Sequence, residues 1–175
     1  AGGDAGGMLA GGTFGDGPRT CTLPPSHVEA GCTAVVAAVR DGVLTVANAG
    51  DSRAVLCRGG EALPLSEDHK PAQARELARI EAAGGFVTPQ GRVNGNLNLS
   101  RALGDLAFKA PRRLVSCVPH VHARALEARD RFLILASDGL WDAMSDSEAV
   151  QLASDALRLA RPGAPPAQRA ADALL

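Results

Sequence analysis

The sequence predicts an α+β fold in which antiparallel sheets are covered by helices. Short apolar runs separated by turn residues fill the middle of the chain, and two helical patterns follow groups of strands. Strands and helices do not alternate regularly, as they would around a parallel sheet. With 175 residues, 46% of them hydrophobic, the chain is long enough for one domain with its own core.

The strand pattern begins after residue 30. Thr33–Val39 is an apolar run, Asp41–Gly42 suits a tight hairpin turn, and Val43–Ala49 is the expected partner strand. Arg53–Cys57 leads through Gly59–Gly60 into a further pairing. We therefore expect an antiparallel meander. Further short strands are expected at Phe86–Thr88, Arg92–Val93, Val121–Leu126 and Phe132–Ala136.

Two helices are expected. The first runs from Pro71 to the pair Gly84–Gly85, because Pro favours the first position of a helix and Gly its end. The second covers Asp146–Leu159, because Ser145 and Glu148 have the spacing of a capping box. Prolines end this second pattern.

Composition divides the chain into three parts. Residues 1–28 are rich in Gly and Pro and have hardly any apolar periodicity, so we expect a disordered tail. Within it, Gly11–Gly17 superficially resembles a phosphate-binding loop, but no strand precedes it and no helix follows, which favours a flexible segment. Residues 29–160 are the expected domain, and residues 161–175 are its Pro- and Ala-rich end.

Charge, hydropathy and cysteines exclude several classes of partner. The net charge of −1 gives no reason to expect nucleic acid, and no apolar run is long enough to cross a membrane. The four cysteines, at positions 21, 32, 57 and 117, form no CxxC pair, which favours reduced thiols over a disulfide or zinc site. A reducing intracellular location, cytoplasm or nucleus, is expected.

Three aspartates stand where predicted strands end. Asp51 follows the strand Val43–Ala49, Asp138 follows Phe132–Ala136, and Asp142 comes four residues later. Carboxylates without His or Cys suit Mg²⁺ or Mn²⁺ better than zinc. Alternatively, Asp51 accepts bonds from its own turn or from Arg53, and Asp138 caps the next turn. The spacing alone leaves both interpretations open.

A series of ordered motifs extends from Gly31 to Val150. They are GCTAVV (31–36), VANAGDSRAVL (46–56), LSEDHKP (65–71), RIEAAGG (79–85), GRVNGNLNLSRALGD (91–105) and LASDGLWD (135–142). Together they resemble the second part of a type 2C metal-dependent protein serine/threonine phosphatase domain, the PPM family. The resemblance implies a partial α-β-β-α sandwich of antiparallel sheets flanked by helices. It also implies a Mg²⁺ or Mn²⁺ pair whose bridging water attacks phosphoserine or phosphothreonine in proteins.

The resemblance also implies roles for particular residues. Asp138 matches a ligand of the catalytic metal pair, and with it Asp51 and Asp142 resemble ligands of an additional, weaker metal site. Thr33 matches a residue beside that site, although a threonine that packs a strand is an equal alternative. The motif with Ser100, Arg101 and Asp105 we interpret as structural.

The chain departs from the family pattern at both ends. Residues 1–30 contain neither the phosphate-binding Arg nor the Asp-Gly-His-Gly-Gly motif, and no final Asp-Asn motif follows the last helix. No catalytic residue is therefore assigned, and we expect little activity from an incomplete domain. The alternative function is a non-catalytic phosphatase-like binding module that lacks the bimetal centre. A less favoured alternative is a site completed by Asp4 or Asp16.

Three other features have ordinary explanations. His120 and His122 would share one face of a strand, but without a third ligand nearby they are expected to be surface residues. Arg112–Arg113 is too short for a nucleic-acid patch. Trp141 is expected to pack the turn that carries Asp138.

Overall fold

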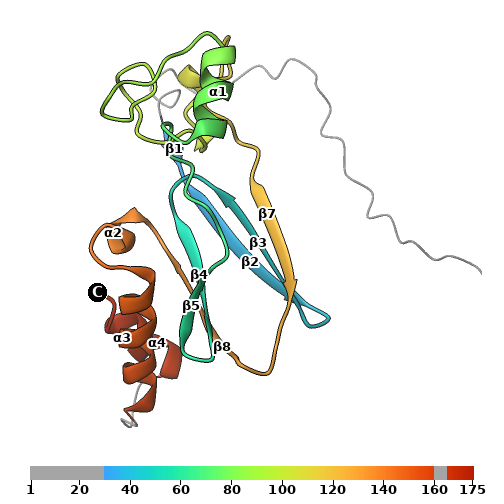
Figure 1. Ribbon diagram of the computed structural model, residues 1–175, viewed down its shortest axis with the longest axis vertical. Helices are drawn as coiled ribbons and strands as arrows, with labels where there is room; N and C mark the ends of the chain where they lie inside the picture. The colour runs from blue at the N-terminus through green and yellow to red at the C-terminus, as the bar shows by residue number, and fades with distance from the viewer. Residues whose placement is uncertain (1–29, 160–164) are drawn as a thin grey trace, which may run out of the picture.

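Two three-stranded antiparallel sheets form the body of the molecule (Figure 1). The computed structural model describes residues 30–159 and 165–175, so the predicted tail lies outside the described residues. The first sheet has the order β2 (Ala34–Arg40), β3 (Val43–Ala49), β7 (His120–Ala125), and the second β5 (Glu61–Pro64), β4 (Arg53–Arg58), β8 (Asp130–Ala136).

The two sheets enclose one apolar core. Leu44 and Val46 of β3 pack with Ala54 and Leu56 of β4, and Leu65 closes the cluster. On β3 the residues that point inward alternate with partly exposed ones, as the two-residue period of a strand requires. The strands predicted over residues 33–49 and 53–57 are therefore confirmed.

A helical layer covers the other face of the second sheet (Figure 1). Val55 and Ile134 pack there against Val150 and Ala153 of α3 (Asp146–Arg158), which begins with the predicted capping box of Ser145 and Glu148. Beside it lie α2 (Asp138–Trp141) and α4 (Pro166–Asp172). The α+β class with helices on antiparallel sheets is confirmed, whereas the sequence pattern did not predict α4.

A small lobe stands beyond the ends of the strands (Figure 1). It holds its own core of Ile80, Val93 and Leu114. Its elements are α1 (Ala74–Ala82), the short strand pair β1 (Gly31–Cys32) and β6 (Leu103–Gly104), and the 3₁₀ turn η2 (Leu106–Phe108). Two charged side chains, Arg79 and Arg101, bind the buried Glu76 and so join α1 to the loop that follows.

The structure corrects three details. The predicted single meander is wrong, because β3 and β4 lie in different sheets and the chain crosses the sandwich at Gly50, whose φ is +117°. The first helix begins at Ala74, since the segment around Pro71 instead returns to the crossing. The strands expected at Phe86–Thr88 and Arg92–Val93 are only isolated bridges.

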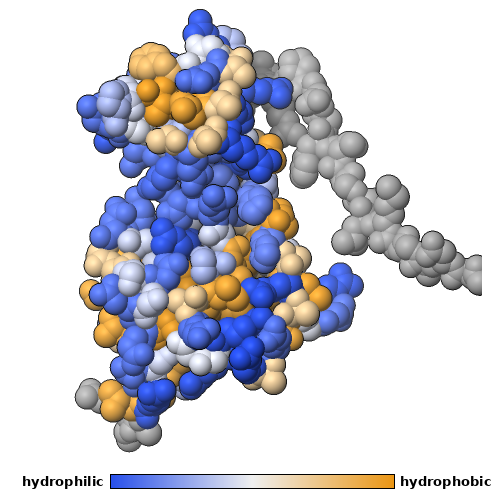
Figure 2. All heavy atoms as spheres, in the orientation of Figure 1, coloured by the Kyte–Doolittle hydropathy of each residue, from blue (hydrophilic) through white to orange (hydrophobic). Residues whose placement is uncertain are grey.

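The outer face of the first sheet is apolar and exposed. Val36 is 59% exposed and Val121 is 55% exposed, and both lie on the face away from the sandwich core, paired with Ala47. Apolar residues also show at the surface of the body in Figure 2. Within residues 30–159 and 165–175, no helix is both long and apolar enough to cross a membrane.

Glu76 gives the lobe an acid-sensitive support. Burial opposes its charge, but hydrogen bonds from Arg101, Arg79 and Ser100 outweigh burial and lower the pKa of Glu76 from 4.5 to about 2. Because the folded-state pKa is depressed, the stability it contributes is present above pH 4.5 and is lost as pH falls towards 2.

We predict that Glu76→Gln lowers the free energy of unfolding by about 3 kcal/mol at pH 7, because it leaves two arginines without their carboxylate. The difference from wild type should shrink between pH 4.5 and 2 in urea unfolding experiments. Glu81→Gln, on the exposed side of α1, is the matched control and should change little. An equal loss in both variants, or a loss independent of pH, would contradict the assignment.

Candidate functional site

The crossing between the two sheets carries Asp51. The backbone N–H of His69 donates to the Gly50 carbonyl at 3.0 Å, and the Gly50 N–H donates to His69 Nδ1 at 3.2 Å. A side chain at Gly50 would collide with Thr33, whose hydroxyl shares a 2.7 Å hydrogen bond with that of Ser52. The crossing is thus fixed on both sides, with Asp51 buried at its centre.

His69 is a neutral support of this crossing. Burial lowers the pKa of His69, and the positive charge of Arg101 lowers it further. A neutral ring can accept the hydrogen bond from the Gly50 N–H. The histidine therefore holds the backbone beside Asp51 without adding charge.

Lys70 binds the carboxylate of Asp51. Its Nζ lies 2.5 Å from Oδ2, and the Asp51 side chain is only 4% exposed. Burial opposes the charge of Lys70, but the hydrogen bond to Asp51 and the charges of Asp51, Asp68 and Asp142 raise its pKa above the ordinary value. Sequence reasoning missed this lysine, although it stands in the LSEDHKP motif.

The other two predicted acids lie on α2, directly after β8. Asp138 is the first residue of α2 and Asp142 its C-cap. Trp141 is buried against the layer of α3, and its Nε1 donates to the Ala136 carbonyl at 2.9 Å, which fixes α2 against the end of β8. The expected packing role of Trp141 is confirmed, and Asp142 is near enough to act on the charge of Lys70.

Arg53 ties the crossing to the helical layer. It donates to both oxygens of Asp68 at 2.9 and 2.8 Å and to Asp146 at 2.6 Å, and its guanidinium lies 5.3 Å from the centre of the Trp141 ring. The bond to Asp68 is the main cause that raises the pKa of Arg53; burial opposes it and Asp146 adds to it. The alternative in which Arg53 binds Asp51 is therefore wrong.

The remaining candidates behave as ordinary structural residues. Ser100 and Arg101 do hold loops, through the His69 carbonyl and Glu76 respectively. His120 and His122 are exposed on β7. The thiols of Cys32, Cys57 and Cys117 are free, and the exposed Arg112 donates to a loop carbonyl.

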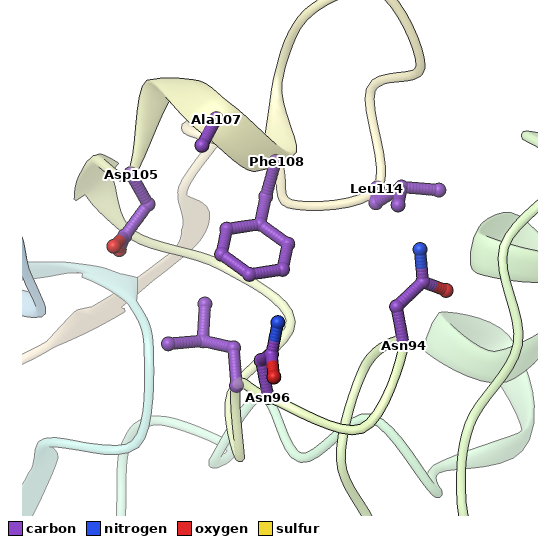
Figure 3. Close-up of a pocket in the computed structure, with 7 residues that line it drawn as sticks. Asn94, Asn96, Asp105, Ala107, Phe108 and Leu114 are labelled. Carbon is purple, nitrogen blue, oxygen red and sulfur yellow. The ribbon is translucent and has the colours of Figure 1, made fainter. Parts of the chain in front are cut away.

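A hollow of about 480 Å³ lies in the lobe (Figure 3). Asp105 and Phe108, from around η2, line one side, and Asn94 and Asn96 line another. Asp105 is buried, and within the described part of the chain no residue donates a hydrogen bond to its carboxylate. Burial raises the pKa of Asp105, and Lys109 offsets part of this effect.

Comparison with known proteins relates these features to a family. The profile described as Protein phosphatase 2C matches residues 20–175. The chain belongs to this family. It is 48% identical over 129 residues to Probable protein phosphatase CG10417 of Drosophila melanogaster, and 45% identical over 144 residues to Probable protein phosphatase 2C 11 of Oryza sativa subsp. japonica. These matches cover 70% and 79% of the chain, but 20% and 39% of the relatives.

Solved structures of the family share the fold. Serine-threonine phosphatase 2C from Toxoplasma gondii superposes with a TM-score of 0.67 at 30% identity, over 81% of this chain and 51% of that one. A C. elegans sex determining protein gives a TM-score of 0.69 at 29% identity, over 81% of this chain and 36% of the other. The chain therefore spans about half or less of the proteins it matches.

The protein phosphatase 2C family is metal-dependent, so the donor set of this chain can be tested against that property. Among the described residues no group of three or more His, Cys, Asp or Glu side chains is arranged to hold a metal ion. Asp51 faces an ammonium group instead. The described residues therefore do not by themselves fit a two-metal centre.

The Arg53 contacts generate a prediction. Arg53→Lys keeps the charge but cannot form the two parallel bonds to Asp68 and the third to Asp146. We expect a loss of about 2 kcal/mol in the free energy of unfolding, measured by urea titration. Arg40→Lys, whose side chain is 91% exposed, is the matched control. If the two variants lose the same amount, the contacts of Arg53 are not what stabilises the crossing.

The buried carboxylate of Asp105 leads to a prediction about the pH dependence of stability. Because its folded-state pKa is raised, the stability it contributes is present at low pH and is lost as pH rises through that pKa. Asp105→Asn should therefore unfold at a higher temperature than wild type at pH 7, and the difference should vanish in acid. Asp41→Asn is a close control, because both aspartates have a left-handed backbone, with φ of 49° and 50°, but Asp41 is exposed. A destabilised Asp105→Asn protein at pH 7 would show that its carboxylate has a partner.

Proposed function

We propose that the protein is a metal-dependent serine/threonine phosphatase that hydrolyses phosphoserine and phosphothreonine in other proteins. The observation that carries this proposal is the match to protein phosphatase 2C across residues 20–175, which includes both motifs that hold the acids. The family's metals supply an activated water for attack on phosphorus. Relatives are named protein phosphatases in fly, rice and human, which supports phosphoproteins as substrates.

For the metal we propose Mg²⁺ or Mn²⁺, with Asp138, Asp51 and Asp142 among its ligands. Carboxylate oxygens without His or Cys suit these hard ions. The support is electrostatic: the charges of Asp51 and Asp142 both contribute to raising the pKa of Lys70. Thr33, between β1 and β2, is proposed to support this position through its hydrogen bond with Ser52.

Among the described residues, the metal-binding side chains are too few for two divalent ions. What the described residues contribute is to hold the three aspartates in place and orient them. Asp51 is rigid because its neighbours on both sides are hydrogen-bonded. Gly50 is bonded to His69, and Ser52 is bonded to Thr33. Asp138 and Asp142 are fixed through the buried Trp141. Further carboxylates are needed to complete the centre.

We propose an intracellular location, cytoplasm or nucleus. The three cysteines that the structure describes are free thiols, one buried and two exposed. Exposed thiols persist in the reduced state where glutathione and thioredoxin are present.

The proposal is tested with a phosphothreonine peptide and the protein expressed from its whole coding sequence. We expect hydrolysis that requires Mn²⁺ or Mg²⁺, is stopped by EDTA, and falls at least about a hundredfold in Asp138→Asn. Asp155→Asn, exposed on α3, is the matched control and should retain activity. The 175 residues alone, assayed beside it, should be far slower, because the part of the chain that the structure describes offers no group of three or more metal-binding side chains. A folded, metal-loaded protein without any hydrolysis would refute the proposal.

A further inference from the structure

The hollow in the lobe has a buried carboxylate in its wall and exposed residues at its rim. Asp105 is 7% exposed and Leu114 is buried as well, whereas Asn96 and Ala107 are exposed. The volume of about 480 Å³ is within the range of sites for small ligands, roughly 300 to 1,000 Å³. A group that enters past the exposed rim can therefore reach the wall that carries Asp105.

The Asp105 carboxylate has no partner of its own. Asp105 is the N-cap of η2, but its side chain makes no capping hydrogen bond. The charge of Lys109 acts on it, yet the Lys109 ammonium donates to the Ala102 carbonyl at 2.6 Å. Within residues 30–159 and 165–175, no group donates to either oxygen of Asp105. A buried carboxylate without a donor lowers stability, and such groups are typical of sites that a ligand completes.

The neighbours of this carboxylate favour a guanidinium group as its ligand. In the view of Figure 3, the Phe108 ring lies beside the Asp105 side chain, and both line the hollow. A guanidinium is planar, so it can donate two parallel hydrogen bonds to a carboxylate and stack on an aromatic ring. An ammonium group has the charge but not the plane. The pair of Asp105 and Phe108 therefore matches an arginine side chain better than a lysine side chain.

The opposite wall favours an arginine that is part of a peptide. Asn94 Oδ1 accepts a hydrogen bond from the Phe86 N–H at 3.0 Å, which leaves the two donors of Asn94 Nδ2 for a carbonyl group. Phe86 also accepts from the Asn94 N–H, at 2.9 Å, and is itself 57% exposed. Figure 2 shows apolar residues gathered on the surface of the lobe. A peptide can cover this apolar surface, whereas a free amino acid leaves it in water.

We propose that the hollow binds the side chain of an arginine in a peptide segment of another protein, with its guanidinium on the Asp105 carboxylate and against the Phe108 ring. Every residue that lines the hollow belongs to residues 94–114, so the site needs no group from outside this segment. The inference goes beyond the proposed function. It involves neither a metal ion nor the hydrolysis of phosphate.

The first test measures the binding of blocked arginine, acetyl-arginine amide, to the protein expressed from its whole coding sequence. Saturation-transfer difference NMR observes the ligand and is suited to the weak affinity of a single side chain, with Kd about 1 mM. Asp105→Asn keeps the shape of the side chain without its charge and should weaken binding at least about tenfold. Since Asp105→Asn is predicted to be more stable than wild type, unfolding would not explain this loss. Unchanged affinity in Asp105→Asn would overturn the proposal.

Asp41→Asn is the matched control for this variant. Asp41 shares the left-handed backbone of Asp105, with φ of 50° and 49°, but its side chain is exposed in a hairpin turn. The Asp41→Asn protein should bind blocked arginine as wild type does. An equal loss of affinity in both variants would mean that net charge, and not the hollow, attracts the ligand, and it would overturn the proposal.

The second test compares ligands on the wild-type protein. Blocked citrulline has the shape of arginine without the charge and should bind at least about tenfold more weakly. Blocked lysine should bind about threefold more weakly, because it cannot stack or bond with two parallel donors. The blocked tripeptide Leu-Arg-Leu should bind severalfold more tightly than free arginine, because its apolar neighbours cover the surface around Phe86. Citrulline or lysine that binds as tightly as arginine would overturn the guanidinium assignment, and free arginine that binds as tightly as the tripeptide would overturn the assignment to a peptide.

The outcomes separate this inference from the proposed function. Arginine binding that Asp105→Asn abolishes supports the site in the hollow even if no phosphopeptide is hydrolysed. Hydrolysis of a phosphopeptide without any binding of blocked arginine supports the phosphatase and rejects the site in the hollow.

Discussion

The structure depends on the crossing at Gly50–Ser52, where the chain passes from one sheet to the other. Both sheets pack around the strands that it joins, since β3 lies at the centre of one sheet and β4 at the centre of the other. The crossing is bonded to His69 from one direction, and the Arg53 that follows it reaches Asp68 and Asp146. These bonds fix the turn that carries Asp51 relative to the segment before Lys70 and to the start of α3.

Much of the fold follows from local signals. The strands were predictable because apolar runs are bounded by turn residues, and α3 because its capping box is local. The change of sheet between β3 and β4 could not be predicted, because a meander and a crossing share the same local sequence pattern. Helix α4 was missed because Pro165 and Pro166 suggest an end, whereas Ala170 and Leu174 behind them pack onto the core.

For a similar reason, the contacts among the candidate site residues could not be predicted from the sequence. Motif resemblance identified Asp51, Asp138, Asp142 and Thr33, but it assigned roles one residue at a time. The pairing of Lys70 with Asp51 joins residues 19 apart through the fold, and no spacing rule indicates it. The same holds for Arg53, whose partner Asp146 is 93 residues away. Charge compensation between distant segments becomes readable only when the segments are placed together.

The position of Trp141 has a practical consequence for studying this turn. It is the only tryptophan of the chain, which has no tyrosine, so the ultraviolet emission of the protein comes essentially from one ring. That ring lies under the guanidinium of Arg53 and one residue before Asp142. Its emission spectrum is therefore a label-free optical report on the electric field at the acidic turn, already built into the chain.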